Sequence, residues 1–380
     1  MRYDPSVTKK AKKTTRPHKG KETLSPQPEG DPHELLPPDA EEFKTLCKLA
    51  RDIQQQMPWE FMEEPDVFGV QDPDNGTLGF VSVMGALGEY TSVAVYRGVE
   101  GLYQWRGFIE LMKADPESEE AHDRLMEIPQ LQLWFGPASF LEEPDREVIK
   151  RSGVKFSKDK PLFRSHWPGY YPWFLTRAEA RHLIHTLTQT IQVAKLFSYD
   201  ANVIPFNEDP EDRDYMIRVP QINDGVIRWK SSFYGIDEPP QQLVPIEVED
   251  AVVEKLKVLP KSDPQEIDLF ILPAKIAESD ERPRVLYALI VSNAITGYVC
   301  GFDALEARNG IDLMYAELAE KVAEIWLHDG VVPVELRARS MKLLNMFQWF
   351  AGELEFKLSL VKELPAIDEA KSSIMEKIRT

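Results

Sequence analysis

The last third of the chain, residues 265–380, carries the pattern that most limits what this sequence can fold into. Three runs with strand character come first, at Ile267–Leu272, Val285–Ser292 and Gly297–Phe302. Helix and strand patterns then alternate, at Leu313–His328, Val334–Arg339, Met341–Leu354, Glu355–Val361 and Ile367–Ile378. Because a helix that connects two parallel strands makes a right-handed crossover, this order predicts a mixed sheet with hairpins at its start and parallel strands at its end.

This order of elements resembles that of a ribonuclease-H-like domain, a fold that usually cuts or moves nucleic acid with a cluster of acidic side chains. Such chemistry needs about three or four carboxylates that hold two divalent ions at the ends of adjacent strands. The candidate metal ligands are Asp268 on the first strand, Glu317 on the first helix and Asp368 on the last helix. The fourth strand, however, is followed by Ser340 instead of an acid. We therefore expect a domain that keeps the fold without the full catalytic set, and a metal-dependent nucleic-acid enzyme is the alternative.

A chain of 380 residues is long for one core, so we expect two main domains. The predicted class is α+β, with an N-terminal α+β module at 38–152 and the ribonuclease-H-like domain at 263–380. An aromatic and proline-rich linker at 153–174 and a connecting region of helix and hairpin at 175–262 separate them. Residues 1–37, which are rich in Lys, Thr, Pro and Gly, are predicted to form a disordered basic tail.

The N-terminal module begins with the pattern of an antiparallel meander. The sequence DPDNG at 72–76 is a strong turn signal between two strand-like runs, Val67–Val70 and Gly79–Met84. A third run follows at Thr91–Tyr96. The meander is therefore predicted to contain about three short antiparallel strands, and a long helix follows it.

The start of that helix offers an alternative site for a small anion. Gly98 and Gly101 flank the predicted helix start, where backbone N–H groups can bind a negative charge. Arg97 would add a positive side chain at the same place. These residues match neither G-x-G-x-x-G nor G-x-x-x-x-G-K-[ST]. A protein that senses a small anion or a nucleotide is therefore a further functional alternative.

The most unusual local composition is a run of aromatic residues and prolines at 163–174. Its favoured interpretation is a stiff connection whose rings pack between the two domains. The alternative is a groove that binds a ligand or a peptide, because aromatic side chains supply large and rigid contact area. The residues that would line this groove are Trp167, Tyr170, Tyr171 and Trp173.

Several motifs resemble those of uncharacterised bacterial proteins that are classed as paired domains of unknown function. In the first module the motifs are DVFGV-x-DP, SVMG-x-x-GE and VYRG-x-EGL. In the second they are PGYYPWFLTRAEARHL and LPAIDEA. The resemblance covers most of residues 38–380, and it implies no activity, no cofactor and no functional residue.

Other catalytic and metal-binding patterns are incomplete. Glu179, His182 and His185 lie three residues apart on one predicted helix, but carboxylate-bridged metal sites use a second copy of this pattern, which the sequence lacks. The sequence also has no G-x-S-x-G elbow. Its two cysteines, Cys47 and Cys300, are expected to be reduced thiols. We therefore expect no metal site and no cofactor.

The net charge of −18 is divided unevenly along the chain. Residues 1–25 contain eight Lys/Arg and two Asp/Glu, a balance of +6, so residues 26–380 carry −24. An acidic body repels phosphates, which argues against nucleic acid as a partner except through the basic tail. The sequence has no transmembrane run and no secretory signal, so we expect a cytoplasmic protein without a membrane partner. The predicted function is that of a non-enzymatic binding or adaptor protein for an unidentified protein or small molecule.

Overall fold

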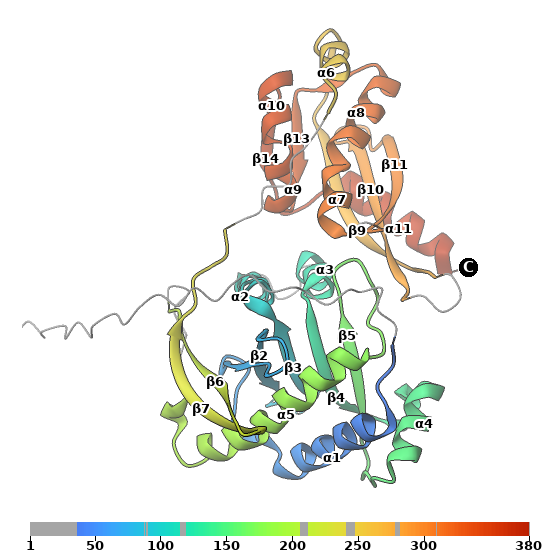
Figure 1. Cartoon of the computed structure of the whole chain (residues 1–380). Coiled ribbons are helices and arrows are strands. Elements are labelled where there is room, and N and C mark those ends of the chain that lie inside the picture. Colours follow the sequence, from blue (N-terminus) through green and yellow to red (C-terminus); the bar gives the residue numbers. More distant parts are fainter. Residues whose placement is uncertain are drawn as a thin grey trace, which may run out of the picture.

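The structure of the chain is a computed structural model that describes residues 36–86, 88, 90–114, 119–205, 212–240, 248–277, 282–308 and 310–379. It contains two units, each built on its own β-sheet, which lie one above the other in Figure 1. We call residues 36–240 the first unit and residues 248–379 the second unit. Both units mix helices with strands, which confirms the predicted α+β class. In the described ranges no helix has the length and apolar character needed to cross a membrane. Residues 1–35 of the predicted disordered tail lie outside the described residues.

The first unit contains five α-helices, three short 3-10 helices and seven strands within its described residues. The helices are α1 (Ala40–Gln56), η1 (Pro58–Glu60), α2 (Gly98–Ala114), α3 (Glu119–Glu127), η2 (Ala138–Phe140), α4 (Glu143–Ser152), α5 (Arg177–Phe197) and η3 (Ala201–Val203). The strands are β1 (Phe68–Gln71), β2 (Leu78–Met84), β3 (Thr91–Arg97), β4 (Gln130–Gly136), β5 (Lys160–His166), β6 (Asp214–Asn223) and β7 (Val226–Gly235).

The sheet of the first unit has the strand order β5-β4-β3-β2-β1-β6-β7. From β1 to β5 each strand runs antiparallel to the next, which confirms the predicted meander. The turn between β1 and β2 forms as its sequence predicts, since the Gly76 N–H donates to the Asp72 carbonyl at 2.8 Å. Gly76 has a φ of 80°, which lies in the left-handed region that glycine adopts without strain.

One predicted boundary differs from the structure. Residues 160–166, inside the predicted linker, form β5, which pairs with β4 along its whole length. Pro161 conceals this strand in the sequence, because proline cannot donate a backbone hydrogen bond to a sheet. β5 lies at the edge of the sheet, where a proline is tolerated. The helix and hairpin of the predicted connecting region, α5 with β6 and β7, also belong to the first unit.

Successive side chains of the strands fill two separate cores, one on each face of this sheet. On β2, Val81 belongs to the core with α1 and α5, whereas its neighbour Phe80 belongs to the core with α2. Helix α5 begins with the capping box that its sequence predicts. The Glu179 N–H donates to Thr176 Oγ1 at 3.3 Å, and the Thr176 N–H donates to the Glu179 carboxylate at 2.9 Å. This cap fixes the Glu179 side chain at the start of the helix.

The second unit contains six α-helices and seven strands within its described residues. The helices are α6 (Asp250–Lys257), α7 (Ile311–Ala316), α8 (Leu318–Asp329), α9 (Met341–Met346), α10 (Gln348–Leu354) and α11 (Pro365–Arg379). The strands are β8 (Lys261–Ser262), β9 (Gln265–Ile276), β10 (Arg284–Asn293), β11 (Val299–Glu306), β12 (Val332–Pro333), β13 (Glu335–Ala338) and β14 (Lys357–Leu360).

The main sheet of the second unit has the strand order β11-β10-β9-β13-β14. The first three strands run antiparallel, whereas β13 pairs in parallel with β9 and with β14. The predicted mixed sheet is therefore confirmed. The two long helices predicted between its strands are each divided, the first at Glu317 and the second at Phe347. The ribonuclease-H-like resemblance itself stays a prediction.

The two units meet through the backbone as well as through side chains. The segment 169–171, which follows β5, lies against the segment 282–285 at the start of β10, and we call this contact the joint. Two backbone hydrogen bonds of 2.9 Å cross it, from the Tyr171 N–H to the Pro283 carbonyl and from the Val285 N–H to the Gly169 carbonyl. A second contact lies between α3 of the first unit and β9 of the second unit.

Trp326 supplies a test of the core of the second unit. Its side chain is fully buried, its indole N–H donates to Gln265 Oε1 at 2.7 Å, and its ring stacks on Phe350. Trp349 also stacks on Phe350 but is 47% exposed, which makes it a matched control. We predict that Trp326→Ala lowers the free energy of unfolding by about 3–5 kcal/mol, and Trp349→Ala by less than about 1 kcal/mol. Urea titrations followed by far-ultraviolet circular dichroism measure both values, and equal losses would contradict this account of the core.

Candidate functional site

The three acidic candidates of the second unit do not group as metal ligands within the described residues. Asp268, on β9, and Asp368, in the first turn of α11, both contact the guanidinium of Arg339. Arg339 Nε lies 3.4 Å from Asp268 Oδ2, and Arg339 Nη2 lies 2.5 Å from Asp368 Oδ1. Glu317 is exposed at the junction of α7 and α8. The chain therefore places an arginine, one residue before Ser340, between two of the three carboxylates.

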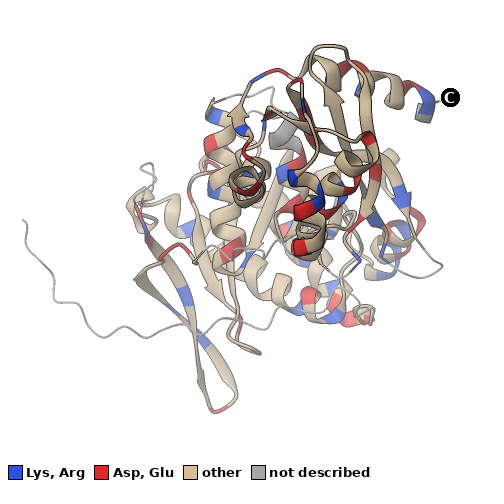
Figure 2. Ribbon diagram, turned by 90° about the horizontal axis from the view of Figure 1, so that it is seen from above, with Lys and Arg blue, Asp and Glu red and all other residues tan. Residues whose placement is uncertain are grey.

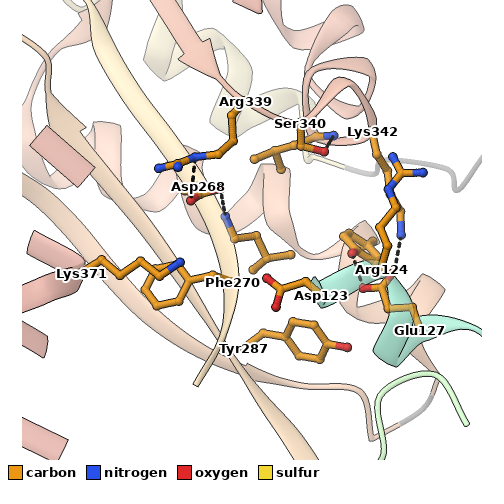
Figure 3. Close-up of a pocket in the computed structure, with 13 residues that line it drawn as sticks. Asp123, Arg124, Glu127, Asp268, Phe270, Tyr287, Arg339, Ser340, Lys342 and Lys371 are labelled. Atoms are coloured by element: carbon orange, nitrogen blue, oxygen red, sulfur yellow. Dashed lines mark hydrogen bonds and ion pairs between the residues drawn. The ribbon is translucent and has the colours of Figure 1, made fainter. Parts of the chain in front are cut away.

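A small pocket of about 50 Å³ lies beside these acids, where α3 of the first unit meets the sheet of the second (Figure 3). We call it the acid pocket. Figure 3 shows the carboxylate of Asp123, from α3, pointing into it above the ring of Tyr287. Glu127, one turn further along α3, accepts hydrogen bonds from Tyr315 Oη at 2.6 Å and from Lys342 Nζ at 3.0 Å. The pocket has room for water but not for a substrate of ordinary size, because its volume is only about 50 Å³.

Asp123 is the acid of this pocket whose pKa is raised into the neutral range. Burial raises the pKa of Asp123 to about 7, and the positive charge of Lys371 offsets only part of that rise. The backbone N–H of Ile271, on β9, donates to its carboxylate at 3.4 Å. The Asp123 carboxyl therefore changes its charge near neutral pH. Sequence reasoning missed this residue, because its surroundings come from the other unit.

A second polar site surrounds the buried carboxylate of Glu179 at the joint. Glu179 Oε1 accepts hydrogen bonds from Arg97 Nη1 at 2.8 Å, from Ser165 Oγ at 2.6 Å and from Trp167 Nε1 at 2.9 Å. Glu179 Oε2 lies 3.7 Å from Nη2 of Arg282, which comes from the second unit. One carboxylate therefore connects β3, β5, the segment after β5 and the second unit.

The charge state of Glu179 follows from these partners. Burial alone would raise the pKa of Glu179, but the positive charges of Arg97 and Arg282, together with the Ser165 hydrogen bond, outweigh burial and lower it. The carboxylate is therefore ionised at neutral pH. Arg97, which the sequence suggests for an external anion, binds this internal one, and its guanidinium lies 4.1 Å from the centre of the Trp167 ring.

The four aromatic candidates lie at or beside the joint but differ in their surroundings. Trp167 and Tyr170 are buried, with 7% and 5% of their surface exposed. The Tyr171 hydroxyl lies 3.3 and 3.2 Å from two backbone carbonyls of β9 in the second unit, to which it donates. Tyr170 and Tyr171 therefore reach the second unit, whereas Trp167 contacts Glu179 and Arg97 of the first unit. Trp173, together with Phe174, instead lines a cavity.

This cavity, which we call the Arg282 cavity, has a volume of about 430 Å³. The residues around it come from the start of α1, from α4, from β5 and from the segment 173–176. Its apolar lining includes Phe43, Val148, Phe163, Trp173 and Phe174. Arg282 is the lining residue that the second unit contributes.

Arg282 is 3% exposed and has an incomplete set of hydrogen bonds. Its Nη1 donates to Ser165 Oγ at 3.1 Å, whereas its Nε and Nη2 have no hydrogen-bond partner among the described residues. Burial lowers the pKa of Arg282, the charge of Glu179 opposes this effect, and that of Arg97 adds to it. The guanidinium nevertheless stays charged at any pH at which proteins fold. A buried charge is thus left with two nitrogens that lack an acceptor.

One group of metal-binding side chains lies away from the joint. Asp72, Asp74 and His185 place ligand atoms within 4.8 Å of one another, and this is the one such group found within the described residues. His182 Nδ1 lies 2.7 Å from Asp72 Oδ2. The Glu179, His182 and His185 pattern of the sequence is therefore divided, with the carboxylate at the joint and the histidines near the turn between β1 and β2. The expectation of no metal site stays a prediction.

Comparisons with known proteins match two family models to the chain. A domain of unknown function, DUF7309, matches residues 43–218. A second domain of unknown function, DUF6930, matches residues 252–375. The comparisons with curated proteins and with solved structures gave no match. The resemblance to paired domains of unknown function is therefore confirmed, but the motif PGYYPWFLTRAEARHL, at 168–183, belongs to the first domain and not to the second.

The raised pKa of Asp123 predicts a specific dependence of stability on pH. Since the folded pKa of about 7 exceeds that of an unfolded aspartate, the folded state binds the proton more tightly, and the resulting stability is lost as the pH rises through about 7. We predict that wild type loses about 2 kcal/mol more than Asp123→Asn between about pH 5.5 and pH 8. Urea titrations of both proteins at both pH values measure this difference.

The comparison with Asp123→Asn also removes an opposing contribution from His166. Burial, with the charges of Arg282 and Arg164, lowers the pKa of His166 to about 4. This residue therefore lowers the free energy of unfolding as the pH falls below the pKa of an unfolded histidine. That cost is the same in both proteins and cancels in the difference. An equal pH dependence of wild type and Asp123→Asn would show that Asp123 is ionised across the whole range.

Proposed function

We propose that this chain, which pairs a DUF7309 domain with a DUF6930 domain, is a non-enzymatic protein that binds a small molecule in the Arg282 cavity. The observation that carries the proposal is the cavity itself. Its volume of about 430 Å³ lies in the range of small-molecule sites, which is roughly 300–1,000 Å³. Its lining combines apolar and aromatic side chains with few polar groups, as such sites do.

The metal-dependent alternative has weaker support. A two-metal site needs several carboxylates that are free to bind ions, whereas Asp268 and Asp368 are paired with Arg339. The acid pocket beside them, at about 50 Å³, is also too small for a nucleotide. In Figure 2, acidic and basic positions are interspersed along the ribbon, which does not favour a nucleic-acid surface in that view.

The fold of the second unit is part of the same proposal. Its strand order, with three antiparallel strands followed by two parallel ones, agrees with the element order on which the ribonuclease-H-like expectation rests. We propose that the second unit has this fold and uses it to support a binding site instead of a catalytic one. Cys47 and Cys300 are free thiols, which supports the expectation of a reducing, cytoplasmic setting.

Native mass spectrometry of gently purified protein tests the binding proposal. We predict a mass above that of the bare chain, caused by a bound small molecule. The substitution Val148→Phe adds bulk to the cavity wall and should abolish this added mass. Phe140→Leu, at a side chain that is 53% exposed and does not line the cavity, is the control and should retain it.

A nuclease assay completes the test. We predict that manganese and magnesium give no cleavage of DNA or RNA beyond that of Asp268→Asn, because Arg339 holds both carboxylates. Two results would contradict the proposal. One is metal-dependent cleavage that Asp268→Asn removes, and the other is a bare wild-type mass.

A further inference from the structure

The turn between β1 and β2 brings two acids to a histidine of helix α5. Asp72 and Asp74 come from the DPDNG turn, and His185 lies within α5. Each side chain offers one ligand atom, and the three atoms lie within 4.8 Å of one another. The sequence shows no second set of ligands for the histidines of α5, but the structure supplies two carboxylates from a turn that is distant in the chain.

The three side chains are close together but do not satisfy one another. Among the described residues, no hydrogen bond or ion pair joins the His185 ring to Asp72 or to Asp74. Atoms that bind one Zn²⁺ ion, each about 2.0–2.2 Å from the metal, lie about 3–4.4 Å from one another. The imidazole and the two acids therefore have nearly the spacing of atoms that share one ion, without a direct contact that would explain it.

Asp72 is fixed in place by the groups behind it. It is 3% exposed, its Oδ1 accepts a hydrogen bond from the Asp74 N–H at 2.8 Å, and its Oδ2 lies 2.7 Å from His182 Nδ1. Burial alone would raise the pKa of Asp72, but His182 outweighs burial and lowers it, so the carboxylate is ionised. Because a carboxylate has about four acceptor sites, these two bonds leave room for a metal. His182 therefore positions Asp72, as groups behind metal ligands commonly do.

The other two side chains of the group are open to solvent. Asp74 is exposed and His185 is half-buried. Within the part of the chain that the structure describes, the Asp74 carboxylate forms no ion pair, since the nearby Arg181 binds Glu42 at 2.7 Å. An ion can therefore reach the group from solvent, and the two carboxylates attract a cation.

We propose that Asp72, Asp74 and His185 bind one Zn²⁺ ion. Imidazole and carboxylate are both zinc ligands, and a water molecule completes the usual four ligands on the open side. The imidazole disfavours Mg²⁺ and Ca²⁺, which take oxygen ligands. The ion connects the β1–β2 turn to α5, so its binding stabilises the first unit. This inference goes beyond the proposed function and departs from the expectation, drawn from the sequence, that the chain has no metal site.

Isothermal titration calorimetry of the full chain with zinc chloride tests the site, after EDTA has removed bound metal and dialysis has removed the EDTA. We predict that wild type binds one equivalent of Zn²⁺ with a micromolar or lower Kd, and Mg²⁺ at least about tenfold more weakly. Asp74→Ala and His185→Gln each remove one ligand and should weaken Zn²⁺ binding at least about tenfold. Circular dichroism checks that both variants fold, and the exposed Asp74 decides the test if His185→Gln does not.

Two control variants should bind Zn²⁺ as wild type does. His328→Gln replaces an exposed histidine of α8 that belongs to no metal-binding group among the described residues. Val148→Phe adds bulk to the Arg282 cavity, whose lining shares no residue with the zinc group. The cavity and the zinc site can therefore fail separately, which keeps this inference distinct from the proposed function.

Three results would overturn the zinc assignment. The first is a wild type that binds less than one equivalent of Zn²⁺ or binds it more weakly than micromolar. The second is equal affinity of wild type and folded Asp74→Ala, which would mean an adventitious ion only, held elsewhere on the chain. The third is a preference for Mg²⁺ over Zn²⁺, because it would show that His185 is not a ligand.

Discussion

A buried carboxylate has to be compensated where it lies, and in this chain Glu179 is compensated by groups from distant parts of the sequence. Arg97 comes from β3, Trp167 from the segment after β5, and Arg282 from the second unit. A buried ion that loses its partner costs about 3–5 kcal/mol. β3, the segment after β5 and the second unit therefore have to lie together around Glu179. The joint and the cavity beside it both depend on this arrangement.

At each of the two contacts described above, one unit supplies a side chain to a site of the other. Helix α3 of the first unit brings Asp123 to the acid pocket of the second, and the second unit brings Arg282 to the cavity of the first. The same unit uses its other central arginine, Arg339, to hold two acids that a metal enzyme would need free. Acids and guanidinium groups in this protein therefore join the units and pair with each other within the second unit.

Local signals made much of the fold predictable from the sequence. The DPDNG turn, the capping box of Thr176 and Glu179 and the alternation of strands and helices after residue 265 each depend on neighbours in the chain. The strand at 160–166 escaped prediction, since Pro161 is tolerated there only because β5 lies at an edge. That position is a property of the sheet and not of the local sequence.

The site was far less predictable, because its residues act across the boundary between the units. Arg97 lies 82 positions from Glu179, and nothing local to Arg282 or Asp123 indicates a partner in the other unit. Arg339 is different. A basic residue directly before the expected acid position, Ser340, is a visible sign that the carboxylates of the second unit have a partner within the chain. Trp167 and Tyr170 stand out in the sequence by their composition, but their buried surroundings followed only from the structure.

Hydrogen–deuterium exchange at the amides of Tyr171 and Val285 tests most directly whether Glu179 holds the units together, because these amides form the two backbone hydrogen bonds of the joint. In Glu179→Gln the two neighbouring guanidinium groups lose their negative partner. We predict that both amides then exchange at least about tenfold faster than in wild type, because local opening becomes easier. The control Glu147→Gln, at an exposed carboxylate of the cavity, should leave both rates unchanged. Unchanged exchange at both amides in folded Glu179→Gln would contradict the account.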